Sequence, residues 1–283
     1  MIAQQDNIFE FVSDTIRRYE EFFEYPYKFS KADTIFCPEY STGAMENPGA
    51  VTYHENYLFR KLEPSREQYS ARGCTITHEL AHMWFGDTVT MKWWNDLWLN
   101  ESFADFINHV IMADQYGNMS FEISDPWMHM NTRKDWGYRE DQAISTHPIA
   151  CVVDNVAESE AIFDGISYSK GASTMRQLYE LVGRPVFKEA CKRYFHKYAW
   201  NNATLHDFLN VFKQVLNEKF GFEEGKEDWD SVGRHYDINQ FNKDWIETAG
   251  MNQLKVKWNS GDFANGKGKV SINQTYCMEQ YQL

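Results

Sequence analysis

The stretch THELAHMWFGD, residues 77–87, places two histidines four positions apart, with a glutamate directly after the first. Residues i and i+4 lie on one face of an α-helix, so His78 and His82 can approach a single metal ion from the same side. The spacing of apolar residues is helical from about Glu67 and continues through both histidines. The sequence therefore predicts a helix that supplies two ligands to a metal site.

Glu101 is the candidate for a third ligand. Zinc in a catalytic site takes three protein ligands and keeps a fourth position open. Residues 83–100 separate His82 from Glu101. A connection of that length allows a second helix, about 15 residues long and starting near Asn100, to return antiparallel and direct its carboxylate at the two imidazoles.

Two further acidic residues flank these ligands. Glu79 lies about 100° around the helix from His78, so it would stand beside the metal and act as the general base for water. Asp105 follows Glu101 at i+4 and could accept the spare N–H of a ligand histidine, or it could be an ordinary acid of the helix surface. The neighbouring aromatic residues are expected to pack the two helices together rather than to form a ligand box: Trp84, Phe85, Trp93, Trp94 and Trp98.

The rest of the chain predicts an α+β fold, with a small mixed sheet followed by a mainly helical part. Strand-like pieces lie between residues 34 and 60, and residues 117–165 have no clear period. From about Leu254 the sequence becomes β-rich. We expect one domain over residues 1–253 and the first strands of a β-sandwich domain over 254–283. Helical spacing is found at residues 6–24, 169–182, 186–198, 204–219 and 238–249.

Composition excludes several classes of protein. The chain has 41 acidic and 28 basic residues, a net charge of −13, which argues against nucleic acid as a partner. Its five cysteines are scattered and form no CxxC pair, which is typical of neither a disulfide scaffold nor a structural zinc site. The sequence predicts no signal peptide and no membrane segment, so a cytoplasmic location is favoured, unless the chain is a piece of a longer protein.

A second motif, GAMENPG at residues 43–49, precedes the histidine pair. Together with HELAH and the later glutamate, it makes the chain resemble the aminopeptidase N family of zinc metallopeptidases, whose catalytic domain is thermolysin-like. The resemblance extends from about Ile8 to Gly250. It includes FCPEYSTGAMENPG, the whole of residues 77–106, STHPI at 145–149 and IFDGISYSKGA at 162–172.

The resemblance implies one zinc ion per chain, held by His78, His82 and Glu101, with Glu79 as the base. It also implies that Glu46 binds the free α-amino group of a peptide, and an ammonium taken into a cleft does need an anionic partner. The remaining implied roles are backbone contacts from Gly43, Ala44 and Met45 to an extended substrate and oxyanion stabilisation by Tyr168. His109, His129 and His147 are interpreted as ordinary core or surface histidines.

These expectations define a zinc aminopeptidase whose partners are peptides with a free N-terminus. Three alternatives remain: an endopeptidase, which Glu46 argues against, a bifunctional aminopeptidase and epoxide hydrolase, and a non-catalytic scaffold. Members of the family also carry a β-rich domain before the catalytic one and a large helical domain after it. Neither is expected within this chain, so the piece alone could bind zinc and yet turn over poorly.

Overall fold

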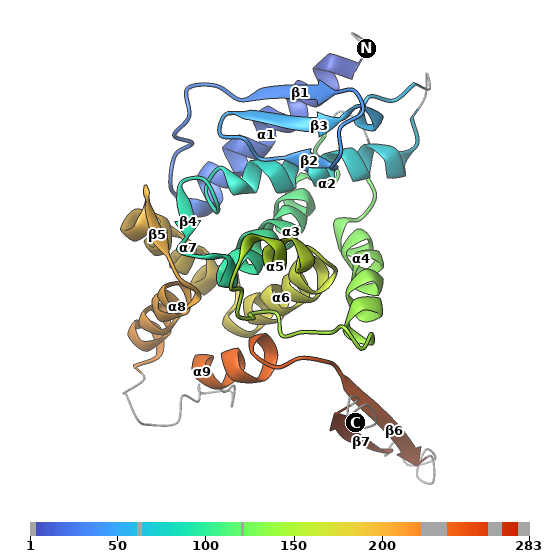
Figure 1. The fold of residues 1–283 in the computed structure, drawn as a ribbon, viewed down its shortest axis with the longest axis vertical. Coiled ribbons are helices and arrows are strands. Elements are labelled where there is room, and N and C mark those ends of the chain that lie inside the picture. The colour runs from blue at the N-terminus through green and yellow to red at the C-terminus, as the bar shows by residue number, and fades with distance from the viewer. Residues whose placement is uncertain (1–3, 61–63, 120–121, 222–236, 260–267, 277–283) are drawn as a thin grey trace.

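The structure is a computed structural model that describes residues 4–60, 64–119, 122–221, 237–259 and 268–276. Its architecture is mixed α+β: a small sheet lies at the N-terminal end, and helices form most of the remaining body (Figure 1). This confirms the predicted fold class. Among the described residues, no helix is both long and apolar enough to cross a membrane.

The small sheet has three strands, β1 (Asp33–Cys37), β2 (Ala44–Met45) and β3 (Ala50–His54), in the order β1-β3-β2. β1 runs parallel to β3, and β2 pairs antiparallel to β3, so β2 is an edge strand. A short 3-10 helix (Glu55–Tyr57) follows β3, and residues 58–60, the described part of the strand-like stretch that comes next, form no strand. In Figure 1, α1 (Gln5–Phe23) passes behind the sheet and α2 (Arg66–His82) lies below it.

Two adjacent helices, α2 and α3 (Leu97–Gln115), form the centre of the molecule. Ser65 begins α2 with a capping box, in which its hydroxyl accepts the Gln68 N–H and the Gln68 side chain accepts the Ser65 N–H. α3 begins three residues earlier than predicted and is almost entirely buried. Of the aromatic residues expected to pack these helices, Trp84, Phe85 and Trp98 are buried, whereas Trp93 and Trp94 are exposed.

The segment 117–165 was predicted to be irregular or mixed, but it contains two helices, α4 (Pro126–Asp141) and α5 (Val156–Ala161). Asp125 caps α4 by accepting the Trp127 N–H, and Pro126 occupies the first turn. Only four of the sixteen residues of α4 are buried, so the helix lacks the apolar stripe by which sequence analysis finds helices.

The remaining predicted helices are present. A π-helix (Ile166–Lys170) leads into α6, and Gly183, at φ 80°, separates α6 from α7. β4 (Val89–Met91) and β5 (Asn201–Ala203) form a short parallel pair. The other elements are α6 (Gly171–Val182), α7 (Arg184–Tyr198), α8 (Leu205–Phe220), α9 (Ile238–Phe241) and a second π-helix (Asn242–Ile246).

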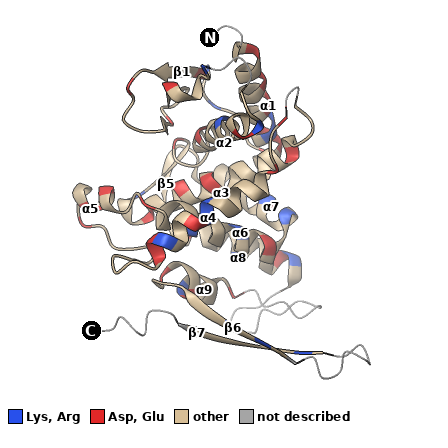
Figure 2. Ribbon diagram, turned by 90° about the vertical axis from the view of Figure 1, so that its right-hand side faces the viewer, with Lys and Arg blue, Asp and Glu red and all other residues tan. Residues whose placement is uncertain are grey.

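An antiparallel hairpin of β6 (Asn252–Asn259) and β7 (Lys269–Tyr276) follows the helices. It lies beyond α9, at the end of the molecule opposite the N-terminus, and extends away from the helical body (Figure 2). The side chains of Leu254, Val256 and Trp258 are exposed. The predicted boundary between residues 253 and 254 stays a prediction, and the expected strand at 278–283 lies outside the described residues.

Gly171, at the start of α6, permits a very close approach to α3. A Cβ at this position would lie 1.8 Å from Ser102 Oγ, whose hydroxyl donates to the Ser167 carbonyl at 2.5 Å. Gly171→Ala is therefore expected to lower the free energy of unfolding by about 1–3 kcal/mol, measured by urea denaturation. If the clash is the cause, Ser102→Gly should lower the free energy of unfolding less in the Gly171→Ala chain than in the parent chain. Losses of stability that simply add would contradict this explanation.

Candidate metal centre

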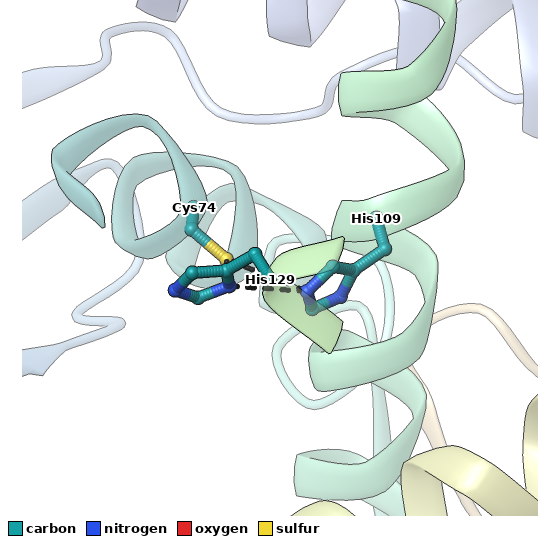
Figure 3. A group of neighbouring side chains, drawn as sticks. All are labelled: Cys74, His109 and His129. Atoms are coloured by element: carbon teal, nitrogen blue, oxygen red, sulfur yellow. Dashed lines mark hydrogen bonds between the residues drawn. The ribbon is translucent and has the colours of Figure 1, made fainter. Parts of the chain in front are cut away.

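Among the described residues, two groups of three side chains could each hold a metal ion. One consists of the predicted ligands His78, His82 and Glu101. The other consists of Cys74, His109 and His129, which Figure 3 shows at the junction of α2, α3 and α4.

The ligand atoms of the first group converge at distances that suit a tetrahedral ion. His78 Nε2 and His82 Nε2 are 3.1 Å apart, and Glu101 Oε2 lies 3.3 Å from His78 Nε2 and 3.6 Å from His82 Nε2. With metal–ligand lengths of ~2.0–2.2 Å and tetrahedral angles, neighbouring ligand atoms would lie about 3.3–3.6 Å apart. The three residues therefore fit a zinc-sized cation.

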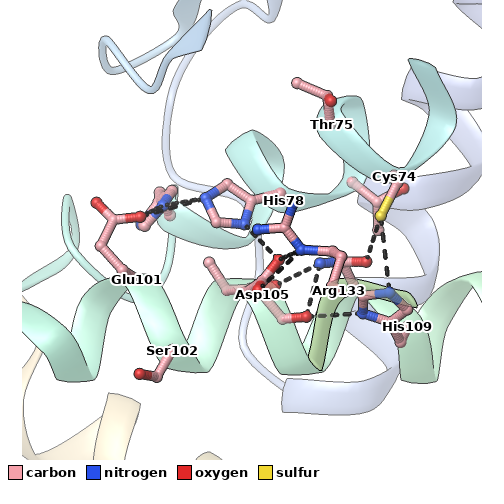
Figure 4. Close-up of polar contacts among 12 residues, drawn as sticks. Cys74, Thr75, His78, Glu101, Ser102, Asp105, His109 and Arg133 are labelled. Carbon is pink, nitrogen blue, oxygen red and sulfur yellow. Dashed lines mark hydrogen bonds and ion pairs between the residues drawn. The ribbon is translucent and has the colours of Figure 1, made fainter. Parts of the chain in front are cut away.

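The local fold orients each of these ligands. The i, i+4 spacing puts both histidines on one face near the end of α2. Glu101 faces His78 from α3 (Figure 4). His82 Nδ1 lies 3.1 Å from the Phe85 carbonyl oxygen, which accepts its N–H. This hydrogen bond leaves the lone pair of Nε2 directed at the other two ligands, the usual support for a metal-bound histidine.

The charges at the site are arranged to hold a cation. Burial alone would raise the pKa of Glu101, but the neighbouring His82 and His78 hold it well below its usual range. Burial alone would lower the pKa of His82, but the charges of Glu46 and Glu101 raise it well above its usual value. These carboxylates therefore keep a proton on His82. A bound cation would displace that proton.

Glu79 follows His78 directly on α2. Its side chain is buried, with 6% of its surface exposed. Burial raises its pKa to about 7, an effect that His78 and His82 oppose and that Glu46 and Glu101 reinforce. A carboxylate whose pKa lies near neutrality is suited to taking up and returning a proton.

Glu46 comes to the same site from the sheet. It directly follows β2, is half-buried, and its negative charge acts on Glu79, His82 and Tyr168. The preceding residues, 43–45, are extended: the Gly43 carbonyl accepts the His54 N–H at 2.8 Å, and Ala44 and Met45 form β2. The glycines and the proline of GAMENPG flank this two-residue edge strand.

Tyr168 reaches the site from the π-helix at 166–170. Its ring stacks on that of His78 with a centroid separation of 6.2 Å, and its hydroxyl is hydrogen-bonded to Glu101. Burial, followed by the charge of Glu101, raises its pKa far above the usual value of a phenol. The hydroxyl therefore stays protonated, as a hydrogen-bond donor must.

Asp105 interacts mainly with a residue that sequence analysis did not single out. Its carboxylate pairs with Arg133 of α4, Nε to Oδ1 at 3.0 Å, whereas His78 Nδ1 lies 4.0 Å from Asp105 Oδ1, beyond hydrogen-bonding distance. In Figure 4, Asp105 and Arg133 lie between His78 and His109. Support of His78 by Asp105 stays a prediction. Arg133 was missed because α4 itself was not recognised.

His147 is held by an ion pair away from the metal ligands. Its Nε2 donates to Asp164 Oδ2 at 2.9 Å, and its Nδ1 donates to the Pro148 carbonyl at 2.7 Å. Burial alone would lower the pKa of His147, but its hydrogen bonds, the one to Asp164 first, raise it to about 10. These contacts agree with the structural interpretation of this histidine.

The His147 pair should make stability depend on pH. Because the folded-state pKa lies above the unfolded value of about 6.5, its contribution is complete below pH 6.5 and is lost as pH rises through about 10. The unfolding free energies of the parent chain and of His147→Gln should therefore differ most near pH 6 and converge towards pH 10. A difference that is constant between these pH values in urea titrations would contradict the assignment.

Comparisons with known proteins agree with this geometry. The model of the peptidase family M1 domain matches residues 8–245. The chain is 40% identical over 255 residues to aminopeptidase N of Streptomyces lividans, covering 88% of the chain and 27% of that protein. It is 35% identical over 262 residues to leucyl aminopeptidase of Saccharolobus solfataricus, covering 92% of the chain and 30% of that protein. It is 37% identical over 242 residues to tricorn protease-interacting factor F2 of Thermoplasma volcanium, covering 86% of the chain and 28% of that protein.

A folded domain with a buried two-histidine, one-glutamate cluster and this extent of similarity defines a peptidase domain. The chain belongs to peptidase family M1. This confirms the resemblance to the aminopeptidase N family. The chain spans less than a third of the length of these three relatives.

Proposed function

We propose that this chain is the catalytic domain of a zinc-dependent aminopeptidase, which removes the first residue from peptides with a free N-terminus. The observation that carries the proposal is the position of Glu46: its carboxylate acts electrostatically on the metal ligand His82 and on the adjacent Glu79. A single-ion metal site with a nearby carboxylate suits general peptide hydrolysis. A second anion beside that site would restrict the reaction to chains that end there with an ammonium group.

His78, His82 and Glu101 would hold the zinc ion, as their separations of 3.1–3.6 Å support. When bound, zinc supplies Lewis-acid polarisation of the scissile carbonyl and lowers the pKa of water. Glu79 takes a proton from the attacking water and later delivers it to the leaving amine. The half-buried Glu46 pairs with the substrate ammonium.

Tyr168 donates a hydrogen bond to the carbonyl oxygen as negative charge develops on it. The raised pKa of the phenol keeps it protonated for this role. The edge strand β2, directly before Glu46, offers its backbone to an extended peptide. Together these contacts align the first peptide bond with the base and the metal ligands.

The experiment uses the full-length protein that contains this chain and compares a peptide with a free N-terminus with its Nα-acetylated form. The parent enzyme should cleave only the free peptide efficiently. Glu46→Gln should raise KM for the free peptide about 10-fold or more, because a charge-assisted hydrogen bond is worth ~1.5–3 kcal/mol. Glu67→Gln, at an exposed position on α2, is the matched control and should leave KM unchanged.

Equal cleavage of free and acetylated peptides by the parent enzyme would rule out an aminopeptidase and favour an endopeptidase. Retention of the preference in Glu46→Gln would remove Glu46 from the amino-group site. Metal content per chain, before and after chelation, separately tests whether the cluster holds zinc.

A further inference from the structure

The second group of ligand-type side chains lies one helical turn from the first. Cys74 precedes His78 by four residues on α2, and His109 follows Asp105 by four residues on α3. His129 completes the group from α4 (Figure 3). Three neighbouring helices thus each contribute one side chain with a metal-ligating atom.

The separations of these atoms are those of a metal site. Cys74 Sγ lies 3.5 Å from His129 Nδ1 and 3.9 Å from His109 Nε2, and the two nitrogens are 3.4 Å apart. For zinc, lengths of ~2.0–2.1 Å to nitrogen and ~2.3 Å to sulfur give tetrahedral edges of about 3.3 Å between nitrogens and about 3.6 Å between nitrogen and sulfur. We infer that Cys74, His109 and His129 form a second metal site, which takes a thiophilic divalent cation such as zinc.

The histidines are prepared for this role. His109 Nδ1 donates to the Asp105 carbonyl at 2.7 Å, which leaves the Nε2 lone pair directed at Cys74 and His129. Burial lowers the pKa of His109 to about 4 and also lowers the pKa of His129. Both imidazoles are therefore neutral at physiological pH, the state in which imidazole binds metals.

Cys74 must lose its proton to become a ligand. Its thiol donates to Asn108 Oδ1 at 3.1 Å, and burial raises its pKa to about 12 in the metal-free chain. Binding a divalent cation as thiolate releases one proton to solvent. Because the Asn108 amide nitrogen donates to the Ala104 and Asp105 carbonyls, its oxygen faces Cys74. This oxygen, or a water molecule beside the half-buried His129, can fill the fourth position.

A hydrogen-bonded polar cluster is the ordinary explanation for such a group, but it explains fewer of the contacts made by the Cys74 sulfur. One thiol–amide hydrogen bond already satisfies Cys74 and does not require two imidazole nitrogens to lie within 4 Å of the same sulfur. Cys191, which is also buried, belongs to no such group among the described residues. A soft thiolate with two imidazoles selects zinc over the hard cations magnesium and calcium.

The position of the site indicates what the ion would do. His129 lies four residues before Arg133 on α4, and Arg133 pairs with Asp105 beside His78. An ion held by α2, α3 and α4 would therefore fix the helix that carries Arg133 against the two helices that carry the first cluster. The second site would act as a structural clip, not as a place of reaction.

Cobalt substitution separates the two sites, because only the second contains sulfur. The metal-free chain, titrated with Co²⁺, should bind two ions and develop thiolate-to-cobalt charge-transfer absorption in the near ultraviolet. Cys74→Ser, which keeps the hydrogen bond to Asn108, should bind one ion without this absorption. His82→Ala should also bind one ion but keep the absorption, and the matched control Cys191→Ser should behave as the parent chain.

Uptake of a single ion by the parent chain without charge-transfer absorption would overturn the inference. So would absorption that persists in Cys74→Ser, since another cysteine would then be the ligand. His129→Gln provides an independent variant at a half-buried position, with circular dichroism as the check of folding, and should also lose the second ion. Added Zn²⁺ should raise the Tm of His82→Ala, which retains the second site, more than that of a His82→Ala/Cys74→Ser double variant.

Discussion

Replacing Glu79 with glutamine is expected to lower kcat by about 10²–10⁴-fold in the full-length protein, with the metal content unchanged. Glutamine keeps the shape of the side chain but cannot take up a proton from water. The residue lies beside the ligands rather than among them, so its loss should spare metal binding. The measurements are steady-state kinetics on a free peptide and metal content per chain.

The pH profile provides a second check on the same residue. The base must be ionised to act, so activity should fall as pH drops below the pKa of Glu79. Burial raises that pKa to about 7 in the metal-free chain, and a bound cation lowers it. The acidic limb of kcat/KM should therefore lie at or below pH 7. Near-normal kcat in Glu79→Gln would assign the base elsewhere, and loss of metal in this variant would instead make Glu79 a ligand.

Replacing His82 with alanine should remove the ion from the first cluster and reduce peptide cleavage to the level of the metal-free protein. His82 is fully buried, and its Nε2 lies 3.1 Å from His78 Nε2 and 3.6 Å from Glu101 Oε2. Without it, two ligands remain and Glu101 loses its strongest partner. Metal content should fall by one ion per chain, and activity should be lost with it.

The matched control for this prediction is His206→Ala, at an exposed position on α8. It removes the same side chain at a site remote from the ligands and should change neither metal content nor activity. A His82→Ala protein that still holds the first ion and cleaves peptides at the parent rate would exclude this cluster as the catalytic centre.

The central helices could be predicted because their information is local. The spacing of His78 and His82 defines a helix face directly, and the eighteen residues before Glu101 are enough for a returning helix. The start of α3 at Leu97 was harder to predict. Buried residues lie on all sides of this helix, so its sequence has no single apolar face.

The parts that were missed depend on contacts distant in sequence. α4 buries only four residues, so its sequence lacks a helical stripe, yet it supplies His129 to the second cluster and Arg133 to Asp105. Cys74, His109 and His129 each appear ordinary in their own segment. Their convergence arises only when α2, α3 and α4 pack together, which no spacing along the chain reveals.

The open edge of β2 restricts which polypeptides could reach the proposed site. Hydrogen bonds to a strand edge involve the main chain, so they discriminate little between side chains. They also require the bound segment to be extended. Proline near the substrate's N-terminus would remove one of the N–H donors. A protein whose first residues are held in a helix or sheet would be protected, and it would become a substrate only after unfolding or an earlier cut had released its N-terminus.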